Sequence, residues 1–163
     1  MRLVASLIFC LLGGPALAAG CDRWSAAMQE DEGGPVMTAQ VCARASASTT
    51  DAEHLLLVQC GGDALAIRFL PFAPDGYPPG GDEEFETNMQ FSLDGARFTE
   101  AARYEAMDGA MAMETRIGGP LAEALKTGKQ VTLSDAGGKV PAATFPLAGS
   151  RAALEKLVAS CRP

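Results

Sequence analysis

Hydrophobic and polar residues alternate over much of the chain, and this alternation predicts a β-rich domain. Between residues 64 and 70 the larger apolar side chains occupy every second position, which is the pattern of a strand with one buried face. The same period of two runs through residues 85–93, and the Asp94-Gly95 pair that follows suits a tight hairpin turn. These segments predict an antiparallel meander.

Shorter apolar runs complete the expected set of elements. Further strands are expected at residues 36–44, 55–60, 97–107, 110–116, 130–133 and 140–146, and a short helix at residues 121–126. Residues 21–29 are expected to form a helical turn that Trp24, the only tryptophan, anchors in the core.

A helical spacing marks the end of the chain. Leu154, Leu157, Val158 and Cys161 follow one another at positions i, i+3, i+4 and i+7, so they share one face of a helix. Ser150 precedes this stripe and is expected to accept a backbone N–H at the start of the helix. The predicted fold class is therefore α+β: an antiparallel sheet, arranged as a meander, with the C-terminal helix packed on it.

The N-terminal residues have the pattern of an export signal. Arg2 precedes an apolar run at residues 3–12, and Ala16-Leu17-Ala18 fits a small-x-small cleavage site. We therefore expect a signal peptide at residues 1–19 and a single domain at residues 20–163, in the periplasm or secreted. The alternative is a lipoprotein anchored through Cys21, because the preceding Ala-Ala-Gly is similar to a lipobox.

Composition narrows the possible partners. The formal net charge is −7 and no cluster of Lys and Arg is visible, which argues against nucleic acid as a ligand. No later stretch approaches the roughly 20 apolar residues of a membrane-spanning helix, so no transmembrane segment is expected after removal of the signal.

Four cysteines lie outside the expected signal, and an exported chain favours two disulfides among them. Cys161 on the buried stripe of the last helix favours Cys60, on a strand, as its partner. That choice leaves Cys21 with Cys42, although four cysteines allow three pairings. The separation of Cys42 and Cys60 is far from a C-x-x-C motif and from the short ligand pairs of zinc sites, so neither a redox pair nor a metal is expected.

Candidate catalytic residues are few. His54 is the only histidine, and no nucleophile-base motif surrounds it, so we interpret it as a surface residue rather than a catalytic one. No enzyme activity and no cofactor are expected.

The loop at residues 71–84 is the candidate functional element. It has four prolines and three glycines, which exclude a central strand, and long loops on a rigid scaffold often bind partners. Phe72 and Tyr77 are its candidate aromatic anchors. Its acidic residues Asp75, Asp82, Glu83 and Glu84 are interpreted as solvated, although they could in principle collect calcium.

The segments LLLVQC, PLAEALKTGKQVTL and TFPLAGSRAALEKLVASC resemble small periplasmic accessory proteins associated with type VI secretion. The matching positions are Phe145, Leu147, Gly149, Ala153, Leu154, Leu157 and Cys161. LKTGKQVTL and the glycine-rich turn after it are also similar to the invasion-associated locus B family of exported proteins. Both resemblances fall within residues 53–161, at hydrophobic, glycine and cysteine positions, so they imply a shared fold more than a shared activity.

Taken together, these features predict an exported, non-catalytic binding or accessory protein of the bacterial cell envelope, linked to a secretion apparatus and acting on a protein partner. The alternatives are a lysozyme-type inhibitor and an enzyme that acts on the envelope. The identity of the partner and the oligomeric state are left open.

Overall fold

The computed structural model describes residues 22–31, 33–44, 53–72 and 79–161. The expected signal peptide, residues 1–19, lies outside this part of the chain. The strands are β1 (Ser25–Asp31), β2 (Gly34–Arg44), β3 (Glu53–Gly61), β4 (Ala64–Leu70), β5 (Glu86–Leu93), β6 (Ala96–Glu105), β7 (Ala110–Arg116), β8 (Gln130–Asp135) and β9 (Ala143–Pro146). The helices are the 3-10 turn η1 (Pro79–Gly81), α1 (Pro120–Thr127) and α2 (Ser150–Ser160).

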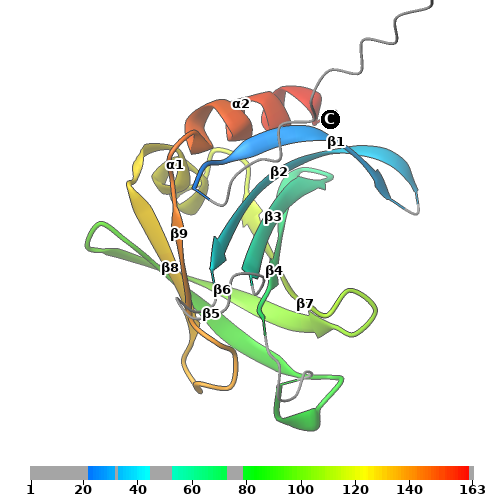
Figure 1. The fold of residues 1–163 in the computed structure, drawn as a ribbon, viewed down its shortest axis with the longest axis vertical. Coiled ribbons are helices and arrows are strands. Elements are labelled where there is room, and N and C mark those ends of the chain that lie inside the picture. The colour runs from blue at the N-terminus through cyan, green and yellow to red at the C-terminus, as the bar shows by residue number, and fades with distance from the viewer. Residues whose placement is uncertain (1–21, 32, 45–52, 73–78, 162–163) are drawn as a thin grey trace, which may run out of the picture.

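All nine strands belong to one open sheet in the order β1-β2-β3-β4-β7-β6-β5-β8-β9, and every neighbouring pair is antiparallel. The hairpins β3-β4 and β5-β6 follow the alternating segments predicted from the sequence. The antiparallel sheet with a C-terminal helix is thus confirmed (Figure 1). What the sequence did not indicate is that β4 pairs with β7, and β5 with β8.

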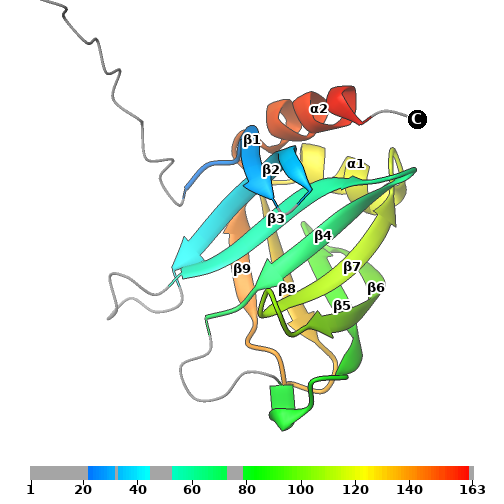
Figure 2. The same cartoon turned by 90° about the vertical axis from the view of Figure 1, so that its right-hand side faces the viewer.

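The sheet curls on itself, so that β2 and β9 contact each other although they are far apart in strand order (Figures 1 and 2). Trp24 fastens this closure. Its backbone N–H donates to Ala148 O and its indole Nε1–H donates to Pro146 O, both at 2.9 Å. The predicted role of Trp24 as a core anchor is confirmed, since only 3% of it is exposed.

Alternate side chains of the strands point into the curled sheet, and we call this side the inward face. The bulkiest fully buried residues there include Phe69, Phe91, Phe145, Leu56 and Met111. α2 contacts β1, β2 and β3, and α1 contacts α2 and β7, so the two helices close one end of the core (Figure 2). Within the described residues, no helix is both long and apolar enough to cross a membrane.

The disulfide between Cys60 and Cys161 joins β3 to the end of α2, with Cα atoms 5.5 Å apart. This confirms the pairing expected from the helical stripe. It is the one disulfide seen between described residues. Cys42, on β2, takes part in an interaction. Its predicted partner, Cys21, lies outside the described residues, so the second disulfide stays a prediction.

Two local expectations are wrong. Residues 22–29 do not form a helical turn: β1 begins at Ser25 and pairs along its whole length with β2. Hydrogen bonds to a neighbouring strand thus override the local helical preference of Ala26 and Ala27.

Ser150 is not the residue that caps α2. Gly149 occupies that position with a left-handed backbone, φ 82°, and Ser150 is the first helical residue. Ser150 is 1% exposed, and its hydroxyl oxygen has no hydrogen-bond partner among the described residues.

Candidate binding groove

A groove of about 790 Å³ lies on the outward face of the sheet, across β4, β7, β6 and β5. Its position follows from the period of two: the neighbours of the inward residues Ile67 and Met113 are Ala66, Arg68, Ala112 and Glu114. Volumes of 300–1,000 Å³ are typical of ligand-binding clefts. The groove is thus large enough for a short peptide or a small molecule.

Strand register aligns outward residues of the lining across the sheet. One complete row is Arg68, Ala112, Arg103 and Glu86; in the next, Ala66 pairs with Glu114 and Ala101 with Asn88, but the β6-β7 register stops before Ala101 and Glu114. Ala66, Ala112 and Ala101 form a low floor among these residues, because a side chain as small as a methyl group leaves room beside the longer side chains opposite it. The charged members of the rows border that floor.

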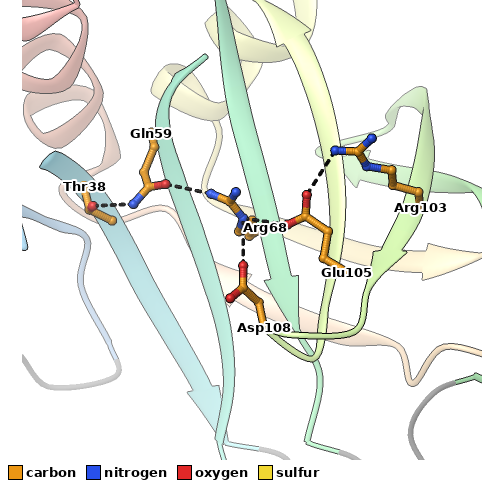
Figure 3. A network of polar contacts seen from close by, with 6 residues as sticks. All are labelled: Thr38, Gln59, Arg68, Arg103, Glu105 and Asp108. Carbon is orange, nitrogen blue, oxygen red and sulfur yellow. Dashed lines mark hydrogen bonds and ion pairs between the residues drawn. The ribbon is translucent and has the colours of Figure 1, made fainter. Parts of the chain in front are cut away.

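A polar network centred on Arg68 borders the groove (Figure 3). The Arg68 Nε–H donates to Glu105 Oε2 at 2.8 Å, and its Nη1–H donates to Gln59 Oε1 at 2.7 Å. Gln59 in turn donates to Thr38 Oγ1 at 2.9 Å. Asp108 lies 3.5 Å from Arg68 Nε, and so the network links β2, β3 and β4 to the β6-β7 turn.

Glu105 is also held by Arg103, whose Nη2 lies 3.2 Å from Glu105 Oε1. Burial raises the pKa of Glu105, but the hydrogen bonds and positive charges of Arg68 and Arg103 outweigh burial and leave that pKa below its usual value. The hydrogen bond to Glu105 raises the pKa of Arg68. Both groups are therefore charged at neutral pH.

A second groove of about 610 Å³ adjoins the first, and the two share Glu100 and Glu114. It lies where β6 and β7 separate. Their ladder runs from Glu105↔Ala110 to Ala102↔Met113 and stops there, although β6 extends back to Ala96 and β7 forward to Arg116. We call this opening, between residues 96–101 and 114–116, the seam.

None of the predicted partner-binding residues that the structure describes lines these grooves. Phe72 is 40% exposed, and Asp82, Glu83 and Glu84 are exposed around η1. Asp82 accepts the backbone N–H of Glu84, which ties this acidic turn locally. Asp75 and Tyr77 lie outside the described residues. The role of this loop in binding stays a prediction.

His54 is not the surface residue expected from the sequence. It is 5% exposed, points to the inward face beside Phe69, and its Nδ1 accepts the backbone N–H of Phe72 at 3.0 Å. Burial lowers the pKa of His54. The residue therefore anchors the start of the proline-rich loop in its neutral form.

The groove was missed in the sequence because it depends on the pairing of β4 with β7, which are not neighbours along the chain. Arg68 and Glu105 are unremarkable polar positions until β4 is known to pair with β7. In the described part of the chain, no group of three or more His, Cys, Asp or Glu side chains is placed to hold a metal ion.

No family model matches the chain, and no curated protein matches it. Among solved structures, the chain is similar to the crystal structure of invasion associated protein B from Bartonella henselae, with a TM-score of 0.57 and 18% identity. The match covers 85% of this chain and 92% of that one. This likeness supports a fold shared with the invasion-associated locus B family, the second of the two families that the sequence resembles. No comparison supports the resemblance to type VI secretion accessory proteins.

Proposed function

We propose that this chain is an exported, non-catalytic protein of the bacterial cell envelope, located in the periplasm, which binds another protein through the outward face of its sheet. The observation that carries the proposal is the groove across β4, β7, β6 and β5, with its alanine floor and charged border. An apolar centre bordered by polar side chains is the layout of protein–protein interfaces.

The electrostatics of the groove favour recognition over proton transfer. A carboxylate that serves as a general acid needs a raised pKa, whereas the pKa of Glu105 is lowered by Arg68 and Arg103. An ionised carboxylate fixed by two guanidinium groups is instead a rigid charge pattern that a partner can complement.

Two further observations are consistent with a place outside the cytoplasm. The Cys60–Cys161 disulfide is of the kind that persists in oxidising compartments. The fold is that of a protein whose name associates it with invasion, which is compatible with an envelope role but says nothing of its activity here. A link to a secretion apparatus rests only on the residues that resemble such accessory proteins.

The test is capture of partners from envelope extract by the purified protein, with Arg103→Glu as the groove variant and Arg151→Glu as its control. Both arginines are largely exposed, at 71% and 60%, so neither change should unfold the protein. We expect Arg103→Glu to lose the partner and Arg151→Glu to retain it. A Phe72→Ala variant measures separately what the loop contributes.

Two assays decide between this proposal and its rivals. Inhibition of lysozyme by the purified protein would select the inhibitor, and clearing of peptidoglycan would select the enzyme. Failure of the unaltered protein to capture any envelope protein would overturn the binding proposal.

A further inference from the structure

The seam between β6 and β7 has backbone edges that face an open groove. The N–H of Tyr104 donates to the carbonyl of Phe85, which precedes β5. Because N–H and C=O groups alternate sides along a strand, the even-numbered residues of β6 turn their backbone groups to β5, and the odd-numbered ones to β7. Thr99 and Ala101 therefore direct their backbone groups into the seam.

The same alternation holds on the opposite side of the seam. Ala112 pairs with Arg103 across the closed part of the ladder, so Glu114 and Arg116 also turn their backbone groups away from β4 and toward β6. The Arg116 carbonyl accepts the N–H of Gly119, which leaves its own N–H on this side. The last pair of the ladder, Ala102↔Met113, is flanked by the Glu114 N–H and the Ala101 carbonyl, and beyond that point the two described strand edges confront each other without pairing.

One side-chain contact spans the gap. Thr115 Oγ1 donates to Glu100 Oε1 at 3.0 Å, in place of the backbone bonds of a continuous ladder. This hydrogen bond between the long side chain of Glu100 and the short side chain of Thr115 holds the two strands at a fixed separation. The groove of about 610 Å³ at this point has a volume that several residues of an extended chain could fill.

The charge of the seam is unbalanced. Its groove is lined by the carboxylates of Asp63, Glu100 and Glu114 and by one guanidinium, that of Arg116. None of the ion pairs between described residues involves these carboxylates. The closed part of the ladder differs, because Arg68 and Arg103 neutralise Glu105 there.

We propose that the seam binds an extended, basic segment of the partner protein, which adds a strand between β6 and β7. This inference rests on the proposed function and names its mode of recognition. Pairing with an exposed strand edge supplies affinity through backbone hydrogen bonds, and alternate side chains supply specificity. Lysine or arginine at alternate positions would place cations over Glu114 and its neighbours.

The test uses a blocked eight-residue peptide in which lysine and valine alternate. One control peptide has glutamate in place of lysine, and another has the valine amides N-methylated, which keeps the charge but removes half of the backbone donors. We expect binding of the lysine peptide alone. Hydrogen exchange followed by NMR should show the amides of Thr99 and Ala101 exchanging fast in the free protein and slowly in the complex.

Charge reversal at the seam supplies the matched variant. Glu114→Lys should weaken peptide binding by about tenfold or more, whereas Glu155→Lys, the same change on the exposed face of α2, should leave it unchanged. The thermal midpoint of each variant checks that it is folded.

Several results would overturn the inference. These are slow exchange at Thr99 and Ala101 in the free protein, equal binding of the N-methylated peptide, and no binding of the lysine peptide at millimolar concentration. Capture of an envelope partner that Glu114→Lys leaves intact would also reject the seam but retain the proposed function. If the unaltered protein captures no envelope protein but still binds the lysine peptide, the proposed function is rejected and the seam is retained as a peptide-binding site.

Discussion

The inward and outward faces of the one sheet are built on different principles. Inward, Phe69, Phe91 and Phe145 are completely buried, and the polar groups among them are few. Outward, over β4, β7, β6 and β5, alanines alternate with charged side chains that pair with one another at the surface. We therefore expect stability to depend mainly on the inward face and, if the proposed function holds, binding to depend on the outward face.

This difference has an energetic consequence. A buried polar group without a partner costs about 1–3 kcal/mol, whereas an exposed ion pair contributes about 0–1 kcal/mol. Changes to the inward face should therefore alter the free energy of unfolding strongly, and changes to the outward face should alter binding with little effect on folding. The following predictions test that division.

The largest effect is expected from the disulfide, which closes a loop with a sequence separation of 101 residues. Replacing both of its cysteines, Cys60→Ala with Cys161→Ala, should lower the free energy of unfolding by about 4–5 kcal/mol, because the unfolded chain regains its freedom. Urea denaturation under non-reducing conditions measures the change. A loss below about 1 kcal/mol would show that the core holds α2 without the cross-link.

Asp135 should come next. This inward residue is 8% exposed and accepts the backbone N–H groups of Gly137, Lys139 and Val140 at 2.9–3.2 Å. Asp135→Ala leaves those donors without their acceptor and should cost about 2–3 kcal/mol, measured by urea denaturation. Asp135→Asn keeps one acceptor oxygen and should cost less; equal losses would mean that the donors find water instead.

A stabilising change is expected at Ser150. Its buried hydroxyl oxygen has no hydrogen-bond partner within the described part of the chain, and alanine is the better helix former. Ser150→Ala should therefore raise the free energy of unfolding by about 1 kcal/mol, observed as a higher denaturation midpoint with the same slope. A lower midpoint would indicate that the hydroxyl has a partner, such as a buried water.

The alternation of apolar and polar residues predicted most of the sheet, because a strand with one buried face requires that alternation. It predicted β4 and β5 closely, and the helical stripe predicted both α2 and the Cys60–Cys161 pairing. Local pattern could not predict β1, because a short edge strand is defined by its neighbour β2 rather than by its own residues. Helix capping at Gly149 was missed for a related reason: a Cβ at this position would lie 3.1 Å from both the Trp24 carbonyl oxygen and the Arg23 side chain, which are distant in sequence.

The candidate groove was not predictable from the sequence. Its rows form only when β7 is placed between β4 and β6, and that strand order is a long-range property. The sequence instead pointed to the loop at residues 71–84, because prolines, glycines and acidic residues are visible without any pairing. His54 shows the same limit: the nearby residues Asp51 and Glu53 that precede it are polar, but its position on β3 buries it against Phe69.

His54 gives a pH-dependent test of the inward face. Its pKa is lowered in the folded state, so below about pH 6.5 the unfolded chain takes up a proton that the folded protein refuses. Stability should therefore be complete above that pH and should fall as the pH is lowered. Denaturation midpoints between pH 7.5 and pH 5.5 measure the loss.

A His54→Gln variant supplies the control for that pH series, because glutamine does not titrate and can accept the N–H of Phe72. We expect its stability to depend less on pH over the same interval than that of the unaltered protein. An unchanged pH dependence would assign the effect to the carboxylates instead.

The smallest effect is expected on the outward face, at Arg103. Its side chain is 71% exposed and forms an ion pair with Glu105, which Arg68 also holds at 2.8 Å. Arg103→Ala should therefore change the free energy of unfolding by less than about 0.5 kcal/mol. A loss above about 1 kcal/mol would mean that the charges of the groove support the sheet as well as recognition. The outward face would then contribute to stability where β6 and β7 pair, contrary to the contrast drawn between the two faces. A loss of binding in an Arg103 variant would have to be distinguished from a loss of folded structure.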